Sequence, residues 1–192
     1  QFFLIFKEPR LLPTYAVIVI YMFMVGILVG FLPVYLHGIG YTPVQSGTAV
    51  SAATLSYLLV QPLAGYLADR ISISITVIVG LSLAAGAIIL TTITTGALLL
   101  VVIIAAGIGV GTVWTNCDAL VGALADEDKL GASMGAAQSF KEFGDMVGPL
   151  LVGFITQFYG VRVGFGSCGA GALVCLLLVV RSGALATANS DG

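Results

Sequence analysis

Three ionisable residues lie close together inside an otherwise apolar run. Lys141, Glu142 and Asp145 stand near the middle of residues 131–159, a stretch long enough to cross a bilayer as a helix. Each charge would cost roughly 2.5 to 3.5 kcal/mol at the centre of a helix surrounded by lipid. We therefore expect these side chains to face other protein or a wet cavity, where a carboxylate such as Glu142 can take up and release a proton.

A helical wheel separates the polar side of this run from its apolar side. The polar side carries Gln138, Lys141, Glu142, Asp145, Pro149 and Thr156. The opposite, lipid-facing side carries Phe140, Phe143, Val147, Leu150, Leu151 and Phe154. Lys141 and Asp145, four residues apart, can pair along the helix, which leaves Glu142 without an obvious partner. Two interpretations stay open: a site that couples proton movement to transport, and salt bridges that only lock the helix to its neighbours.

The composition is that of an integral membrane protein. Of the 192 residues, 59% are hydrophobic and only 8% are charged, whereas soluble domains carry about 25% charged residues. The net charge of -2 and the lack of a basic stripe exclude a nucleic-acid partner. Cys117, Cys168 and Cys175 lie in apolar runs without metal-ligand spacing, so we expect neither a metal site nor a cofactor.

Six apolar runs follow one another along the chain. The expected spans are about 13–36, 44–68, 73–95, 97–119, 132–158 and 163–180. Backbone amides within lipid must be bonded internally, and these runs are too long for barrel strands, so the spans are helices. The prediction is an all-α membrane bundle over residues 13–181, with a cytoplasmic linker at 1–12 and a cytoplasmic tail at 182–192.

The distribution of basic residues predicts the orientation. Six spans place both ends of the chain on one side, and that side carries Lys7, Arg10, Arg70, Lys129 and Arg181. Only Arg162 falls on the other side. The positive-inside rule then puts both termini in the cytoplasm, and we expect the plasma (inner) membrane. The sequence begins with Gln1 and shows no signal-peptide pattern, so we interpret it as part of a longer chain.

Two motifs and the entry segment carry a resemblance to a known family. A glycine precedes an Asp-Arg pair by four residues after the second span, at Gly65, Asp69 and Arg70. The fifth span contains Asp145 followed by the pair Gly148-Pro149. With the charged linker 7–10, these features resemble the C-terminal six-helix half, helices 7 to 12, of a drug- or sugar-efflux member of the major facilitator superfamily.

The resemblance implies a fold and a mechanism. The fold is a 3+3 inverted-repeat bundle, half of a secondary transporter that moves a small-molecule substrate by alternating access, with proton coupling and as an antiport or efflux carrier. The other half would be a missing N-terminal six-helix segment or a second copy of the chain. Gly65, Asp69 and Arg70 would form a gating turn, although the sequence has Ser72, Ile73 and Ser74 where the family has glycine and two basic residues. Helices 73–95 and 163–180, which lack charges, would lie outermost against the lipid bilayer.

A competing hypothesis is a six-helix membrane subunit for binding or assembly, in which the buried charges only fix helix packing. Gly131 to Gly135 also matches the hydrolase pattern around a nucleophilic serine, here Ser133. That chemistry needs a strand-to-helix elbow and a nearby base, and His37, the only histidine, falls at the opposite face. We therefore do not expect an enzyme.

The remaining candidate residues lie on the first and fourth spans. Trp114 and Asn116 are candidates for substrate contact by stacking and hydrogen bonding, and Trp114 equally suits an interfacial anchor. Tyr21 is the deepest tyrosine and the best cavity candidate of its span, with a place in the interfacial belt as the alternative. Asp118 is interpreted as an end-of-helix charge. Three glycine pairs at helical spacing predict close helix contacts: Gly107/Gly111, Gly144/Gly148 and Gly160/Gly164.

Overall fold

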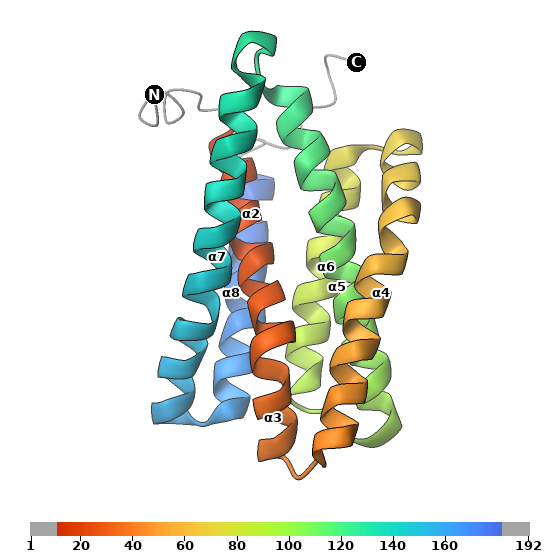
Figure 1. Ribbon diagram of the computed structural model, residues 1–192, viewed down its shortest axis with the longest axis vertical. Helices are drawn as coiled ribbons and strands as arrows, with labels where there is room; N and C mark the ends of the chain where they lie inside the picture. Colours follow the sequence, from red (N-terminus) through yellow and green to blue (C-terminus); the bar gives the residue numbers. More distant parts are fainter. Residues whose placement is uncertain (1–10, 182–192) are drawn as a thin grey trace.

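The fold is an all-helical bundle, seen along its length in the computed structural model, which describes residues 11–181 (Figure 1). The helices are α2 (Leu12–Gly26), α3 (Leu32–Gly38), α4 (Pro43–Arg70), α5 (Ile73–Thr91), α6 (Gly96–Leu124), α7 (Leu130–Tyr159) and α8 (Val161–Arg181), with short turns η1 (Ile27–Phe31) and η2 (Glu127–Lys129). Segments α2, η1 and α3 form one continuous span, so the described residues make six long helices. The expected linker 1–12 and tail 182–192 lie almost wholly outside the described residues.

Local chemistry explains where several of these helices begin and end. Thr42 caps α4: its hydroxyl accepts from the backbone N–H of Gln45 at 3.3 Å, and the side chain of Gln45 accepts from the N–H of Thr42 at 2.9 Å. Helix α5 ends at Thr91, four residues before the expected end of the third span, because the chain turns there and enters α6 through Gly96 at φ +64°. Gly160, at φ +86°, makes the turn between α7 and α8.

The first span is not a uniform α-helix. Pro33 has no N–H, so the carbonyl of Val29 lacks its usual helical donor. The chain responds with a π-helical turn over Ile27–Phe31 before α-helix resumes at Leu32. This break lies in the middle of the span and was not predicted from the sequence.

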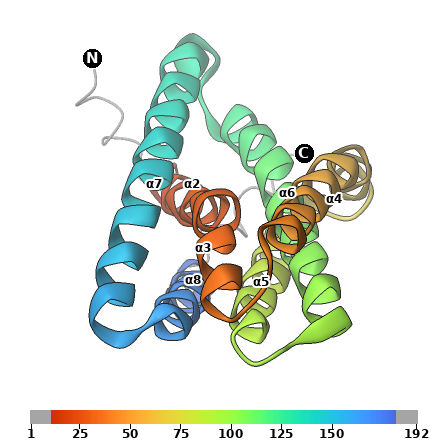
Figure 2. The same cartoon turned by 60° about the horizontal axis from the view of Figure 1, so that its bottom comes forward.

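The helix pairs interleave the two halves of the chain (Figure 2). Helix α4, second in the chain order of spans, packs extensively on α6, the fourth, while α7, the fifth, packs on α2, the first. The third and sixth, α5 and α8, pack on each other. Exchanging the first three helices with the last three maps the α4–α6 and α2–α7 pairings onto each other and the α5–α8 pairing onto itself, as a 3+3 repeat requires.

Two glycine pairs make the interleaved contacts close, as predicted. A Cβ at Gly107 or Gly111 of α6 would run into the backbone carbonyls of Ala53 or Tyr57 of α4. On α7, a Cβ at Gly144 would lie 2.5 Å from the carbonyl oxygen of Val19, and Gly148 packs similarly on Phe23 of α2. The third pair differs, because Gly160 belongs to the turn and only Gly164 is packed, against Thr156 of α7.

The bundle has the composition of a multi-pass membrane protein. Five of the six long helices in the described part of the chain are long and apolar enough to cross a bilayer. The sixth, α7, has 30 residues and is also long enough, but it contains Lys141, Glu142 and Asp145. Helix α4 buries only a narrow stripe of small residues, which leaves most of its surface uncovered.

Candidate functional site

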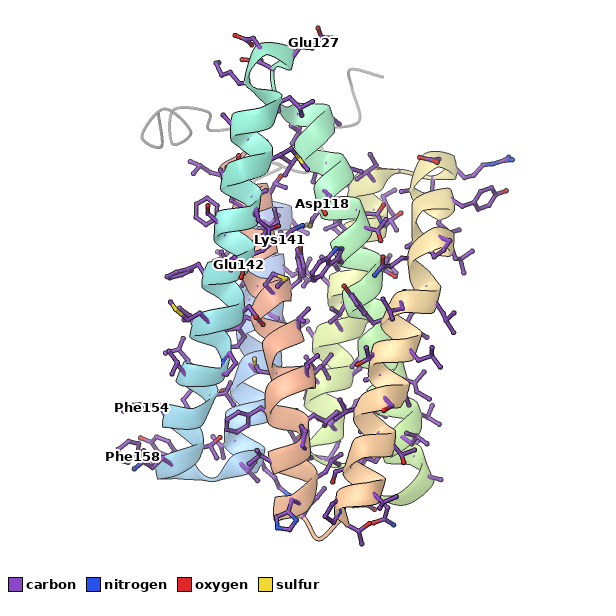
Figure 3. The ribbon with its side chains drawn as sticks, viewed as in Figure 1. Asp118, Glu127, Lys141, Glu142, Phe154 and Phe158 are labelled. Atoms are coloured by element: carbon purple, nitrogen blue, oxygen red, sulfur yellow. The ribbon has the colours of Figure 1, made fainter. Side chains whose placement is uncertain are left out.

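A partly buried ion pair joins α6 to α7. The ammonium Nζ of Lys141 lies 2.6 Å from Oδ1 and 2.8 Å from Oδ2 of Asp118, and the two side chains point toward each other between the helices (Figure 3). The Lys141 side chain is 7% exposed and the Asp118 side chain 33%. Two interpretations from the sequence are therefore corrected: Lys141 pairs with Asp118 and not with Asp145, and Asp118 is not a solitary end-of-helix charge.

Three aromatic rings gather at this ion pair. The Lys141 ammonium lies 5.0 Å from the ring centroid of Trp114, which precedes Asp118 by one helical turn. The Trp114 ring in turn lies 5.7 Å from Tyr21 of α2 and 5.6 Å, edge-on, from Tyr57 of α4. We call these five residues the Trp114 cluster. Four helices contribute to it, so a shift of α6 against α7 would change the contacts of this cluster.

The hydroxyl of Tyr21 marks the cluster as a polar site inside the bundle. Tyr21 is fully buried, and its hydroxyl makes no hydrogen bond with any residue of the described part of the chain. Buried hydroxyls nearly always have a partner, so this group has capacity for a polar atom of a ligand. Tyr21 was predicted as a cavity residue, and the structure places it in the cluster with Trp114.

A second polar surface lies beside the cluster on the uncovered side of α7. Gln138 donates from Nε2 to Oε1 of Glu142 at 2.7 Å, and both side chains are exposed. Asp145, also exposed, continues the row one turn further on, and its Oδ1 lies over Gly26 of α2. The expected polar side of this helix is thus divided, with Lys141 directed into the bundle and the other three residues directed out of it.

Asn116 does not join the cluster. It is 1% exposed, and its amide donates to the carbonyl oxygen of Thr112 at 2.8 Å on the same helix. The amide also lies 3.5 Å from the carbonyl oxygen of Ala64, so Asn116 faces the packed α4–α6 contact. Its polar groups serve helix packing in this arrangement.

The last turns of α4 contain the three residues expected to form a gate. Gly65 is partly buried and would bring a Cβ within 3.8 Å of Thr115, whereas Asp69 and Arg70 are exposed. The Arg70 guanidinium lies 5.3 Å from the ring centroid of Tyr66, on its own helix. Gly65 thus faces α6 beside Trp114, while the charged pair lies at the exposed end of α4.

Ser133 occupies a packing position. It is 3% exposed, and its carbonyl oxygen accepts from the hydroxyl of Tyr15 at 3.3 Å, which joins α7 to α2. The ring of Phe140 stacks on Tyr15, with 4.9 Å between the ring centroids, so this residue, which was expected to face lipid, is partly covered. Phe143 and Phe154 are exposed, as expected.

Within residues 11–181, no three His, Cys, Asp or Glu side chains come close enough to hold a metal ion.

Sequence reasoning missed two members of the cluster. Asp118 is the one charged residue in the run 97–119, and that isolation was a usable signal because a lone charge inside an apolar helix needs a partner. Tyr57 gave no such signal, since α4 exposes most of its surface and its sequence does not show which side meets α6.

Comparison with known proteins identifies the fold. The family model described as Major Facilitator Superfamily matches residues 14–189. A solved peptide transporter POT in complex with sulfate superimposes with a TM-score of 0.83 at 22% sequence identity, over 92% of this chain and 38% of that chain. A bacterial homologue of the human drug peptide transporters PepT1 and PepT2 superimposes with a TM-score of 0.78 at 16% identity, over 93% of this chain and 43% of that one.

Two relatives are similar in sequence. The multi-drug resistance efflux pump PmrA of Streptococcus pneumoniae is 26% identical over 161 residues, which are 81% of this chain and 40% of that protein. The quinolone resistance protein NorA of Staphylococcus aureus is 23% identical over 157 residues, again 81% of this chain and 40% of that protein. The chain thus spans about 40% of the length of the relatives that it matches.

Proposed function

Because the chain belongs to the major facilitator superfamily, we propose that it is the C-terminal six-helix half of a secondary active transporter working by alternating access. The observation that carries this proposal is the Trp114 cluster, in which buried charge and a buried hydroxyl lie among four helices of the bundle. Ionisable groups inside a membrane are costly and usually serve a transport path or a proton relay. The names of the similar proteins, a multi-drug efflux pump and a quinolone resistance protein, favour small organic solutes and an export direction.

The uncovered surfaces of α7 and α4 indicate that another bundle packs against this one. The polar row Gln138, Glu142 and Asp145 would be exposed to hydrocarbon if α7 faced lipid on that side. A second six-helix bundle, either an N-terminal half or another copy of this chain, would cover that row and the open face of α4. The solute would then cross between the two bundles.

The basic residues support one orientation of the bundle in the membrane. The end of α4, the turn between α6 and α7 and the end of α8 lie at one end of the bundle (Figure 1), and they carry Arg70, Lys129 and Arg181. Arg162 belongs to the start of α8, at the opposite end. This asymmetry supports cytoplasmic termini in a plasma (inner) membrane.

Proton coupling is assigned to the carboxylates near the cluster, with Glu142 the first to test. The carboxylate of Glu142 accepts a hydrogen bond from Gln138 and forms no ion pair with any of the described residues. Protonation of Glu142 would therefore break no ion pair. We expect Glu142→Gln to keep downhill flux of the solute but to lose its dependence on an imposed pH gradient. The measurement is solute flux in vesicles that contain the intact protein, with and without the gradient.

Glu127→Gln is the matched control, because it makes the same chemical change in the exposed turn η2, far from the cluster (Figure 3). Its flux should keep the full response to the gradient. Unchanged coupling in Glu142→Gln would reject a proton-carrying role for Glu142 and leave the carboxylate of Asp118 as the next residue to replace.

A second candidate function is a six-helix subunit for binding or assembly, with purely structural charges. The observation in its favour is that Lys141 and Asp118 satisfy each other within one chain, so the pair can serve to hold α6 against α7. Removing both charges together distinguishes the two functions, as argued in the Discussion.

A further inference from the structure

Lys141 occupies a place suited to an organic cation. Its ammonium is held by a carboxylate, Asp118, and by the face of an aromatic ring, Trp114, at 5.0 Å. These two groups are the ones that bind cations with apolar substituents in proteins. Tyr57 meets the same ring edge-on, and the buried hydroxyl of Tyr21 adds one polar group at the edge of this place.

The space around Tyr57 suits an apolar substituent. A small cavity of about 50 Å³ lies between α2, α4 and α6, lined by Tyr57 and by apolar side chains and backbone that include Val25, Leu28 and Val110. Because Tyr57 belongs both to this cavity and to the Trp114 cluster, a charged group at Asp118 would have an apolar site adjoining it.

Asp145 lies where a displaced Lys141 ammonium could go. The two residues are four apart on α7, the spacing at which a lysine and an aspartate on one helix can pair. Asp145 is exposed, and its carboxylate makes no hydrogen bond or ion pair with any other residue between 11 and 181. Lys141 could therefore leave Asp118 without becoming an unpaired charge, which would otherwise be costly inside a membrane.

We propose that Lys141 is an internal competitor for the transported solute: an organic monocation takes its place between Asp118 and Trp114, and the displaced ammonium pairs with Asp145. This inference rests on the proposed function and names its substrate class. Asp118 holds a cation before and after the exchange, and the Lys141 ammonium faces a carboxylate in both states. Asp145 gains its partner only when the solute is bound. The ion pair between α6 and α7 is broken by solute binding, which links occupancy of the site to the separation of the two helices.

Equilibrium binding of tetraphenylphosphonium to the purified intact protein tests the exchange. Tetraphenylborate, an anion of nearly the same shape, is the probe for charge selectivity. We expect tetraphenylphosphonium to bind and tetraphenylborate not to bind. Asp145→Asn should weaken tetraphenylphosphonium binding by about threefold to fifteenfold, the range for polar contacts between helices in a membrane. Asp128→Asn, the same change in the exposed turn η2, should leave the affinity unchanged.

The second variant separates the exchange from a direct effect of Asp145. Lys141→Met removes the competitor, so tetraphenylphosphonium should bind at least about threefold more tightly, and Asp145→Asn should have no further effect in that background. A loss of affinity from Asp145→Asn that is the same with and without Lys141 would overturn the exchange. So would unchanged affinity in Asp145→Asn alone, a result that does not depend on Lys141→Met folding.

The failure of this inference differs from a failure of the proposed function. If wild-type protein carries solutes across vesicle membranes but binds both tetraphenyl ions equally or neither, the cation site is rejected and transport stands. If no gradient-driven flux of any solute is found while tetraphenylphosphonium binds with the expected pattern of variants, the site stands and transport is rejected.

Discussion

Asp118→Asn is expected to reduce transport by the intact protein to less than about a tenth of the wild-type rate. The change removes the carboxylate that holds the Lys141 ammonium in its buried position, where the Lys141 side chain is 7% exposed. Removing one partner of a fully buried ion pair usually costs about 3 to 5 kcal/mol; because a third of the Asp118 side chain is exposed, we expect about 1 to 3 kcal/mol here. A loss of 1.4 kcal/mol in a step of the transport cycle already lowers its rate about tenfold. Initial rates of solute flux in vesicles, corrected for the amount of protein, provide the measurement.

The double variant Asp118→Asn with Lys141→Met distinguishes a role of the ion pair in transport from a role in helix packing alone. Both charges are removed together, so no unpaired ion remains and most of the lost stability should return. Transport should stay below about a tenth of the wild-type rate, because the site has lost the groups that bind and release the solute. Recovery of transport in the double variant would show that the pair only holds the helices together, as in the competing assembly-subunit hypothesis.

Gly144→Ala is expected to lower the free energy of unfolding by about 1 to 3 kcal/mol. The added methyl group would lie 2.5 Å from the carbonyl oxygen of Val19 and 2.9 Å from Cβ of Met22, so α7 must move away from α2. Unfolding by sodium dodecyl sulfate in mixed micelles measures the change. Because the exposed polar row lies on the same helix, the displacement should also reduce transport.

Gly135→Ala is the matched control on the same helix. No atom lies within 4 Å of a Cβ at Gly135, and alanine favours the helix over glycine by about 1 kcal/mol. The control should therefore be as stable as wild type or slightly more stable. Equal destabilisation by both substitutions would contradict the close α2–α7 contact as the cause.

Most of the fold was predictable because few backbone structures can satisfy all of their hydrogen bonds within lipid. An apolar run of about 20 residues must become a helix, and six such runs in the sequence correspond to the six long helices of residues 11–181. The glycine pairs on α6 and α7 also revealed where helices meet, since only glycine permits backbones to approach so closely. The π-helical turn in the first span was missed, because the sequence shows Pro33 but not how the chain accommodates it.

The site was only partly predictable. Lys141 and Asp145 are neighbours along one helix, so their pairing could be proposed from spacing alone. The pairing of Lys141 with Asp118 joins residues 23 positions apart and depends on how α7 is rotated against α6, which no local pattern records. The helical wheel likewise treated the polar side of α7 as one surface, whereas packing on α2 turns Lys141 inward and leaves Glu142 exposed.

The interleaving of helix pairs also dictates an order of events during synthesis. Helices α2 and α4 leave the ribosome before α6 and α7, yet these later helices are their main packing partners. Until α6 and α7 are inserted, α2 and α4 remain separate helices in the bilayer, and lipid covers the surfaces that later contact α7 and α6. Assembly of this bundle is consequently a late step, and a nascent chain halted before α6 would lack the main packing partners of both α2 and α4.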